Sequence, residues 1–294
     1  MQIRSIGQIV LDITRAYDWY ADLGISPVGT RLQEIHDYVM YQLLNTATPE
    51  AKALVAGTGD EDTYYALIDG AGFGQIATEI SKLPSHLLPR RTLRDVLKGP
   101  LAASEEESGP TADPRNKFVE LELAAHLSSG GFKLLGFDDL EFEFEGHRYL
   151  VECKRPSHEG KLDDNIEKAY SQLRKKLDGP SSRGIIAVAV EKVFSLDNRF
   201  VMVETPSSVS ALAVAIAQQF RDKVAKYENH WLDPRVVGVL AIIRFLMKTK
   251  APEFIGSSYT CGLVKLASPE VSQATESNRL DRMIEKLRDK FLEA

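Results

Sequence analysis

The chain has 294 residues, of which 44% are hydrophobic, and a formal net charge of −6 at pH 7. A chain of this length and composition buries a core and forms one large or two modest domains. Its net negative charge excludes a general attraction to nucleic acid, so any binding of phosphates would need a local basic patch. No apolar run approaches the roughly 20 residues that span a bilayer, and two cysteines are too few for a disulfide framework, so the expected location is the cytoplasm.

Residues 1–98 are predicted to form a mostly helical N-terminal region, because apolar residues recur there at helical spacing. The segments with this spacing, the last of them short and basic, are 6–24, 30–44 and 88–99. Residues 99–114 gather Gly, Pro, Ala, Ser and acidic residues with almost no bulky apolar side chains. That is the composition of a linker.

Residues 115–294 are predicted to form an α/β domain that ends in a C-terminal helix. Strands alternate with helices around apolar, β-branched runs, which predicts a mixed sheet covered by helices on both faces. The predicted helices are 116–127, 162–177, 207–228 and 270–291. The predicted strands are 140–145, 147–155, 184–190, 236–246 and 259–267.

The first two of these strands are predicted to form a hairpin with its turn at Gly146. Along the first strand, apolar residues alternate with glutamates, which separates an apolar from an acidic face. Along the second strand, Glu152 and Lys154 share one face. The pairing of two strands across a short turn brings Asp139, at the start of the first strand, near Glu152.

Two carboxylates this close repel one another unless a cation lies between them. Mg²⁺ prefers one or two carboxylates together with water and phosphate oxygens, and it can activate a bound water and offset charge on a phosphate. A lysine on the same face, Lys154, can orient that water or stabilise the developing charge. Asp139, Glu152 and Lys154 therefore indicate a metal-dependent phosphodiesterase site, with a simple Glu152–Lys154 ion pair as the alternative.

The same residues resemble the motif of the PD-(D/E)XK nuclease superfamily, in which an Asp precedes an apolar strand and an acidic residue stands two positions before a Lys. The resemblance covers about residues 115–250 and implies a restriction-endonuclease-like core. It also implies a nuclease that hydrolyses DNA phosphodiester bonds with Mg²⁺ or Mn²⁺, in defence, restriction or repair. The proline of the motif is missing, which leaves Asp138 as a second candidate ligand beside the preferred Asp139.

The family also places a glutamate on the helix before the first strand, where Glu120 and Glu122 are the candidates. On a helical wheel Glu122 lies beside His126 in the only polar sector, so it is expected to be solvated. Glu120 projects among apolar residues, where a carboxylate needs a partner such as a metal. Glu120 is therefore the predicted third metal ligand. In some relatives a glutamine on the next helix assists the site, and Gln172 is similar in placement.

The helix predicted at 162–177 has an apolar stripe and, beside it, a basic flank. Such a row of lysines can contact successive phosphates without reading sequence, although it can also serve solubility. The predicted nucleic-acid contacts on this flank are Lys161, Lys168, Lys175 and Lys176. The opposite flank, with Asp163 and Glu167, is expected to be solvated.

A different function remains open, that of a non-catalytic module that binds nucleic acid or protein on the same fold. The expected partner is nucleic acid, and the resemblance favours DNA over RNA. No contact with a membrane is expected, and a homodimer is left open.

The glycines of "GAGFG" at 70–74 do not fit the spacing of a dinucleotide-binding loop. Cys153 is predicted to be a small core residue, with a reactive thiol as the alternative.

Overall fold

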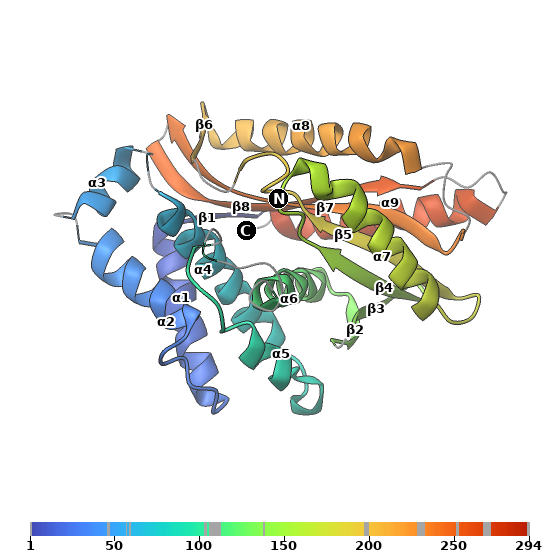
Figure 1. The fold of residues 1–294 in the computed structure, drawn as a ribbon, viewed down its shortest axis with the longest axis horizontal. Helices are drawn as coiled ribbons and strands as arrows, with labels where there is room; N and C mark the ends of the chain where they lie inside the picture. The colour runs from blue at the N-terminus through green and yellow to red at the C-terminus, as the bar shows by residue number, and fades with distance from the viewer. Residues whose placement is uncertain are drawn as a thin grey trace.

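The structure, a computed structural model, describes residues 2–45, 48–56, 58, 60–102, 105, 113–137, 139–196, 200–227, 233–250, 253–266 and 272–292. Figure 1 shows a curled mixed sheet with helices on both faces, which confirms the predicted α/β class. The strands are β1 (Gln2–Ser5), β2 (Lys133–Gly136), β3 (Leu140–Phe144), β4 (His147–Lys154), β5 (Ser182–Ala189), β6 (Phe200–Val203), β7 (Val236–Lys250) and β8 (Glu253–Lys265).

The helices of the N-terminal half are α1 (Ile6–Asp22), α2 (Arg31–Asp37), the π-helix η1 (Tyr38–Leu43), α3 (Pro49–Ala56), α4 (Glu61–Ile80), the 3₁₀-helix η2 (Ser85–Leu87) and α5 (Arg90–Asp95). Those that follow are α6 (Asp113–Ser129), the 3₁₀-helix η4 (Glu159–Lys161), α7 (Leu162–Lys176), α8 (Pro206–Val224), the 3₁₀-helix η5 (Ala225–Tyr227) and α9 (Ser272–Leu292). None of the helices so described is long and apolar enough to cross a membrane.

The strands lie in the order β1-β8-β7-β5-β4-β3-β2, and β6 pairs with the later part of β7. The centre of the sheet is parallel, because β4 pairs with β5 and β5 with β7 in the same direction. Both sides are antiparallel, through β2-β3-β4 on one side and β7-β8-β1 on the other. Helix α7 connects the parallel strands β4 and β5, as a parallel pair requires.

Two hydrophobic cores lie on opposite faces of this sheet. The first packs the sheet against α1, α2, α4, α6 and α9, and the second packs it against α7 and α8. Strand β4 contributes to both, because its side chains alternate: Tyr149 and Val151 enter the first core and Leu150 enters the second. Glu152 and Lys154 continue the Leu150 side of the strand, so they belong to the face that α7 covers.

The N-terminal region is mostly helical, as predicted, but its first residues join the sheet. Residues 2–5 form β1, which pairs antiparallel with β8 between Gln2 and Tyr259 at one end and between Ser5 and Gly256 at the other. The polar tetrapeptide QIRS gave no sign of a strand. In the predicted linker, residues 103, 104 and 106–112 lie outside the described part of the chain.

The glycines at 70, 72 and 74 lie within α4 and not in a loop, which confirms that they are no nucleotide-binding turn. A Cβ atom on Gly70 would come within 2.6 Å of Ile13 Cδ1, and one on Gly72 within 2.6 Å of Phe118 Cζ. A Cβ atom on Gly74 would overlap Asp12. These glycines therefore let α1 and α6 approach the α4 backbone closely.

Candidate active site

The β3–β4 hairpin has the predicted turn and register. Leu140 pairs with Val151, and Phe144 pairs with His147 across a turn formed by Glu145 and Gly146. Both turn residues have positive φ, 47° and 75°, as a two-residue hairpin turn of the favoured type requires. The register places Asp139, directly before Leu140, opposite Glu152.

Two lysines bind the carboxylates at this end of the hairpin. Lys154 Nζ donates to Glu152 Oε1 at 2.6 Å. Lys176 Nζ, from the last turn of α7, donates to Asp139 Oδ1 at 2.5 Å and to Glu152 Oε2 at 3.0 Å. A single ammonium group thus lies between the two carboxylates that the sequence predicted to need a cation.

Exposure increases from the inner to the outer residues of the site. The side chains of Glu152 and Lys154 are each 13% exposed, that of Lys176 is 32% exposed and that of Asp139 is 43% exposed. Glu152 and Lys154 are therefore largely removed from water, where charge interactions are stronger than at a surface. Asp139 lies at the solvent side, from which a substrate can approach.

Glu120, on α6, lies at the start of β3, where its Oε1 accepts a hydrogen bond from the Leu140 backbone N–H at 3.1 Å. Helix α6 packs on the face of the sheet opposite to α7. Burial, together with the neighbouring charges of Glu152 and Asp139, raises the pKa of Glu120 to about 7. The Leu140 N–H and the Lys176 ammonium oppose this shift. Glu120 is thus fixed at the start of β3, within electrostatic reach of the other carboxylates.

The ammonium of Lys176 is held in its charged form. Partial burial opposes the charge, but the hydrogen bonds to Asp139 and Glu152 outweigh it and raise the pKa of Lys176 above its ordinary value. The Lys176 ammonium therefore supplies the positive charge between Asp139 and Glu152.

The donor set suits a hard divalent cation, since carboxylate oxygens are the ligands that Mg²⁺ and Mn²⁺ prefer. Within the described part of the chain, no three His, Cys, Asp or Glu side chains are grouped so that they hold a metal ion as they stand. Ligation by Glu120, Asp139 and Glu152 together therefore stays a prediction. Asp138 lies outside the described residues, so the choice between it and Asp139 also stays a prediction.

Gln172 lies on α7 one turn before Lys176, on the same flank of the helix. Its Oε1 is buried and has no hydrogen-bond partner among the residues that the structure describes. A buried acceptor of this kind needs an explanation, such as a water or a ligand. Its predicted assistance to the site remains a prediction.

The apolar stripe of α7 is buried as predicted, and the lysines beside it have different surroundings. Lys161 pairs with Asp164 at 2.9 Å, Lys168 and Lys175 are exposed, and Lys176 turns toward the carboxylates. On the opposite flank Asp163 and Glu167 are exposed, as expected. Asp163 also accepts hydrogen bonds from Tyr227 and Lys226.

The expectation that Glu122 is solvated is wrong. Glu122 is 3% exposed and accepts a hydrogen bond from Arg244 Nη1 at 3.0 Å, and His126 beside it is 2% exposed. Burial raises the pKa of Glu122 to about 7, and the Arg244 charge opposes the shift. The helical wheel identified a polar sector correctly, but that sector faces a buried arginine and not water.

Glu122 belongs to a buried ion cluster that sequence reasoning missed. Asp69 on α4 contacts Arg115 at 2.7 Å and Arg31 at 3.4 Å, and Arg244 on β7 contacts Glu191 as well as Glu122. The members of the buried ion cluster are Arg31, Asp69, Arg115, Glu122, Glu191 and Arg244. The sequence sign of such a buried ion is a single charged residue inside an apolar run, such as Asp69 in "YYALIDG" and Arg244 in "VLAIIRFL".

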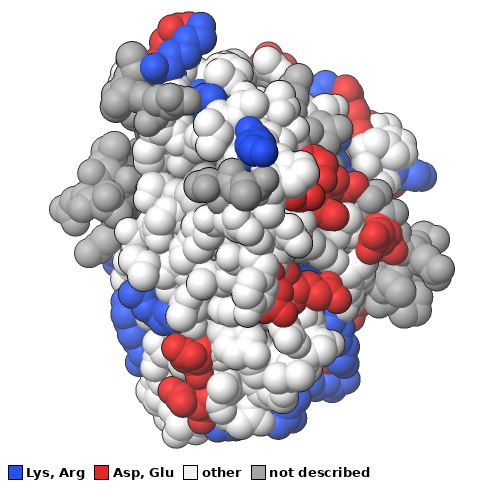
Figure 2. All heavy atoms as spheres, turned by 90° about the vertical axis from the view of Figure 1, so that its left-hand side faces the viewer, with Lys and Arg blue, Asp and Glu red and all other residues white. Residues whose placement is uncertain are grey.

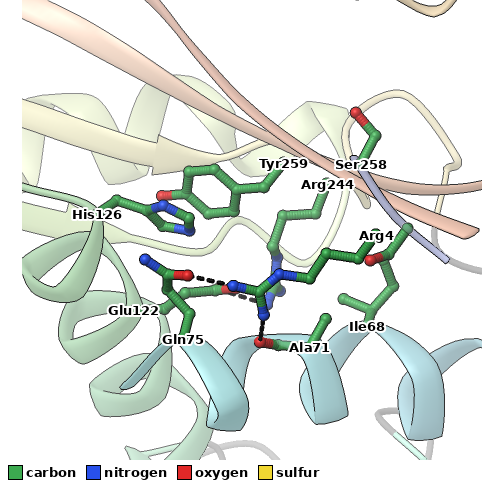
Figure 3. A pocket seen from close by; sticks show the side chains of 10 residues that line it. Arg4, Ile68, Ala71, Gln75, Glu122, His126, Arg244, Ser258 and Tyr259 are labelled. Atoms are coloured by element: carbon green, nitrogen blue, oxygen red, sulfur yellow. Dashed lines mark hydrogen bonds and ion pairs between the residues drawn. The ribbon is translucent and has the colours of Figure 1, made fainter. Parts of the chain in front are cut away.

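A cavity of about 20 Å³ borders this cluster (Figure 3). Arg4 reaches into it and donates to the Ala71 carbonyl oxygen at 2.5 Å and to the Gln75 side chain. The volume has room for about one water and excludes a nucleotide or a substrate. The cavity is therefore part of the packing between β1, α4, α6 and the sheet.

Cys153, next to Glu152, packs against the first hydrophobic core. Burial raises the pKa of its thiol well above the ordinary value, and the charges of Glu120 and Glu152 add to this effect. Since the thiolate is the reactive form of cysteine, this environment favours the predicted core role over a reactive thiol.

Comparisons of the chain with models of protein families, with curated proteins and with solved structures find no match. The candidate site therefore has to be judged by its own geometry and chemistry.

Proposed function

We propose that the chain is a metal-dependent nuclease of the PD-(D/E)XK type, which hydrolyses phosphodiester bonds of DNA with Mg²⁺ or Mn²⁺. The observation that supports this proposal best is the β3–β4 register, which sets Asp139 opposite Glu152 with one cationic group between them and Lys154 on the inner carboxylate. The antiparallel β2-β3-β4 strands followed by a crossover through α7 to β5 support a restriction-endonuclease-like core.

In this proposal Asp139, Glu152 and Glu120 would hold the metal ion. The bound ion would offset charge on the phosphate and lower the pKa of a water. Lys154, oriented by Glu152 Oε1, positions the attacking water or stabilises charge on the phosphate as the bond breaks. Because its side chain is only 13% exposed, bulk water does not screen this interaction fully.

Contacts to DNA phosphates are assigned to the exposed lysines of α7, Lys168 and Lys175. The face formed by the N-terminal helices suits DNA less well. Figure 2 shows it mostly uncharged, with acidic groups gathered in several places and no continuous basic surface among the residues described. The proposed DNA path therefore follows the α7 side of the sheet.

A second candidate function, a non-catalytic module that binds nucleic acid or protein, is favoured by one observation. Lys176 already supplies a cation to Asp139 and Glu152, so these carboxylates are compensated without a metal ion. Metal uptake separates the two functions, because a binding module does not need a divalent ion here.

The test is incubation of the purified chain with plasmid, linear and single-stranded DNA, with Mg²⁺, with Mn²⁺ and with chelator. The nuclease proposal expects cleavage only with metal, and loss of that cleavage in Lys154→Ala at unchanged fold. Cleavage that survives this substitution, or DNA binding with no cleavage of any substrate, would favour the binding module.

A further inference from the structure

We infer that Lys176 is an internal cation that competes with the divalent metal for Asp139 and Glu152 and has to leave them before the metal binds. The inference rests on the proposed function and adds a step to it. Metal uptake becomes coupled to the position of one side chain, and the lysine released by the metal becomes available to a substrate phosphate.

The hydrogen bonds of Glu152 show why a lysine must move. Its Oε1 accepts from Lys154 at 2.6 Å, and its Oε2 accepts from Lys176 at 3.0 Å. Both carboxylate oxygens are therefore engaged by ammonium groups. Asp139 Oδ1 is engaged by the same Lys176 ammonium at 2.5 Å. A metal that binds both carboxylates would occupy the place that Lys176 Nζ holds.

Lys176 is the lysine suited to leave. Its side chain is 32% exposed, compared with 13% for Lys154, and it comes from the last turn of α7 and not from the strand that carries Glu152. Lys176 bridges Glu152 of β4 and Asp139, which directly precedes β3, whereas Lys154 pairs with Glu152. Departure of Lys176 thus opens the position between Asp139 and Glu152 without disturbing the Glu152–Lys154 pair.

The released ammonium has a destination at the solvent side of the site. It starts beside Asp139, which is 43% exposed, and it follows the exposed Lys175 on the same helix. An anionic phosphate that approaches there can pair with it. The two cations would then divide their roles, with the metal on the carboxylates and Lys176 on the substrate.

The experiment measures Mn²⁺ binding by calorimetry on the full chain without DNA. Lys176→Met removes the ammonium and keeps an aliphatic stem, so Mn²⁺ should bind roughly 5- to 150-fold more tightly, the typical size of the coupling between two linked binding events. Lys175→Met is the matched control, since it removes the same charge from the next position of α7. Its affinity for Mn²⁺ should stay within about 2-fold of the parent. Circular dichroism checks the fold, and Lys176→Gln serves if Lys176→Met does not fold.

The outcomes separate the inference from the proposed function. Tighter binding in the Lys176 variant that Asp139→Asn abolishes supports both. Equal affinity in the parent and the Lys176 variant, with binding lost in Asp139→Asn, overturns the inference and keeps the nuclease site. An equal gain in Mn²⁺ affinity in Lys175→Met also overturns the inference, because the loss of any positive charge on this part of α7 would then explain the gain. Absence of Mn²⁺ binding in the parent and in the Lys176 variant overturns both.

Discussion

Lys154 and Glu152 are joined by a hydrogen bond of 2.6 Å along one face of β4, and both side chains are 13% exposed. Strand alternation puts the two residues on the same face, and the mostly buried position keeps the ammonium beside the carboxylate. A lysine fixed in this way can act on a substrate without first being ordered, which is the property that electrostatic catalysis requires.

Lys154→Ala and Asp139→Asn should both reduce DNA cleavage, but only Asp139→Asn should regain activity when the Mn²⁺ concentration is raised. Removal of a transition-state interaction in Lys154→Ala is expected to cost roughly two to three orders of magnitude in rate, with DNA affinity nearly unchanged. Asp139→Asn weakens the metal site, so high Mn²⁺ should restore part of its activity. Cleavage rates measured against Mn²⁺ concentration check this, and a Lys154→Ala protein that Mn²⁺ restores would contradict it.

The exposed lysines of α7 should contribute to DNA affinity through phosphates. The double substitution Lys168→Glu with Lys175→Glu is expected to weaken binding to all sequences alike. It should also reduce the slope of log affinity against log salt by about 0.9 for each duplex phosphate that the protein no longer neutralises. The fold should survive, because both side chains lie outside the buried stripe of α7. Binding measured by fluorescence anisotropy at several salt concentrations checks the prediction; an unchanged slope would assign these lysines to solubility.

Glu120 should make the metal-free protein less stable as the pH rises toward neutrality. Its pKa is raised from 4.5 to about 7 in the folded state, so the folded chain binds this proton more tightly than the unfolded chain does. The resulting stabilisation is fully present below about pH 4.5 and is lost as the pH rises to about 7. Glu120→Gln should remove this part of the pH dependence. Urea unfolding of both proteins between pH 4 and pH 8, in the presence of chelator, compares the profiles, and parallel profiles would count against the prediction.

Arg244 should be essential for stability, because it lies among the carboxylates of Asp69, Glu122 and Glu191 in the buried ion cluster. Arg244→Met leaves Glu122 and Glu191 without their buried cation, which is expected to cost about 3–5 kcal/mol. Lys250→Met is the control at the C-terminal end of β7, where the Lys250–Glu204 ion pair is exposed. That pair should be worth at most about 1 kcal/mol. Denaturant unfolding measures both, and similar losses in the two variants would be inconsistent with this role.

Two glycine substitutions in helices should have effects of opposite sign. A Cβ atom at Gly74 would overlap Asp12 of α1, so Gly74→Ala should destabilise by about 1–3 kcal/mol. At Gly7 in α1 the nearest atom to an added Cβ is Ser5 Oγ at 3.9 Å. Gly7→Ala should therefore stabilise by up to about 1 kcal/mol, since alanine favours helix more than glycine does. The midpoints of thermal unfolding give the two signs, and stabilisation by Gly74→Ala would argue against close packing of α1 on α4.

The sequence by itself determined the local features of the candidate site. The period of two in residues 140–154 and the turn at Gly146 determined the β3–β4 register and therefore the placement of Asp139 opposite Glu152. The apolar spacing in residues 162–177 determined which side of α7 is buried. These features depend on contacts between residues close in the chain, whose side-chain periodicity reports directly which face each residue occupies.

Only the tertiary structure decided which partner each face meets. Pairing of β1 with β8 joins residues 2–5 to residues 256–259, and no local pattern in QIRS indicated it. The polar sector of α6 looked solvated until Arg244, 122 residues away, proved to lie against Glu122. Lys176 belonged to a basic flank in the sequence, yet its ammonium binds Asp139 and Glu152. The physical reason is common to all three: local periodicity shows which face of a segment is apolar or polar, but which distant segment meets that face or a strand edge depends on the packing of the whole chain.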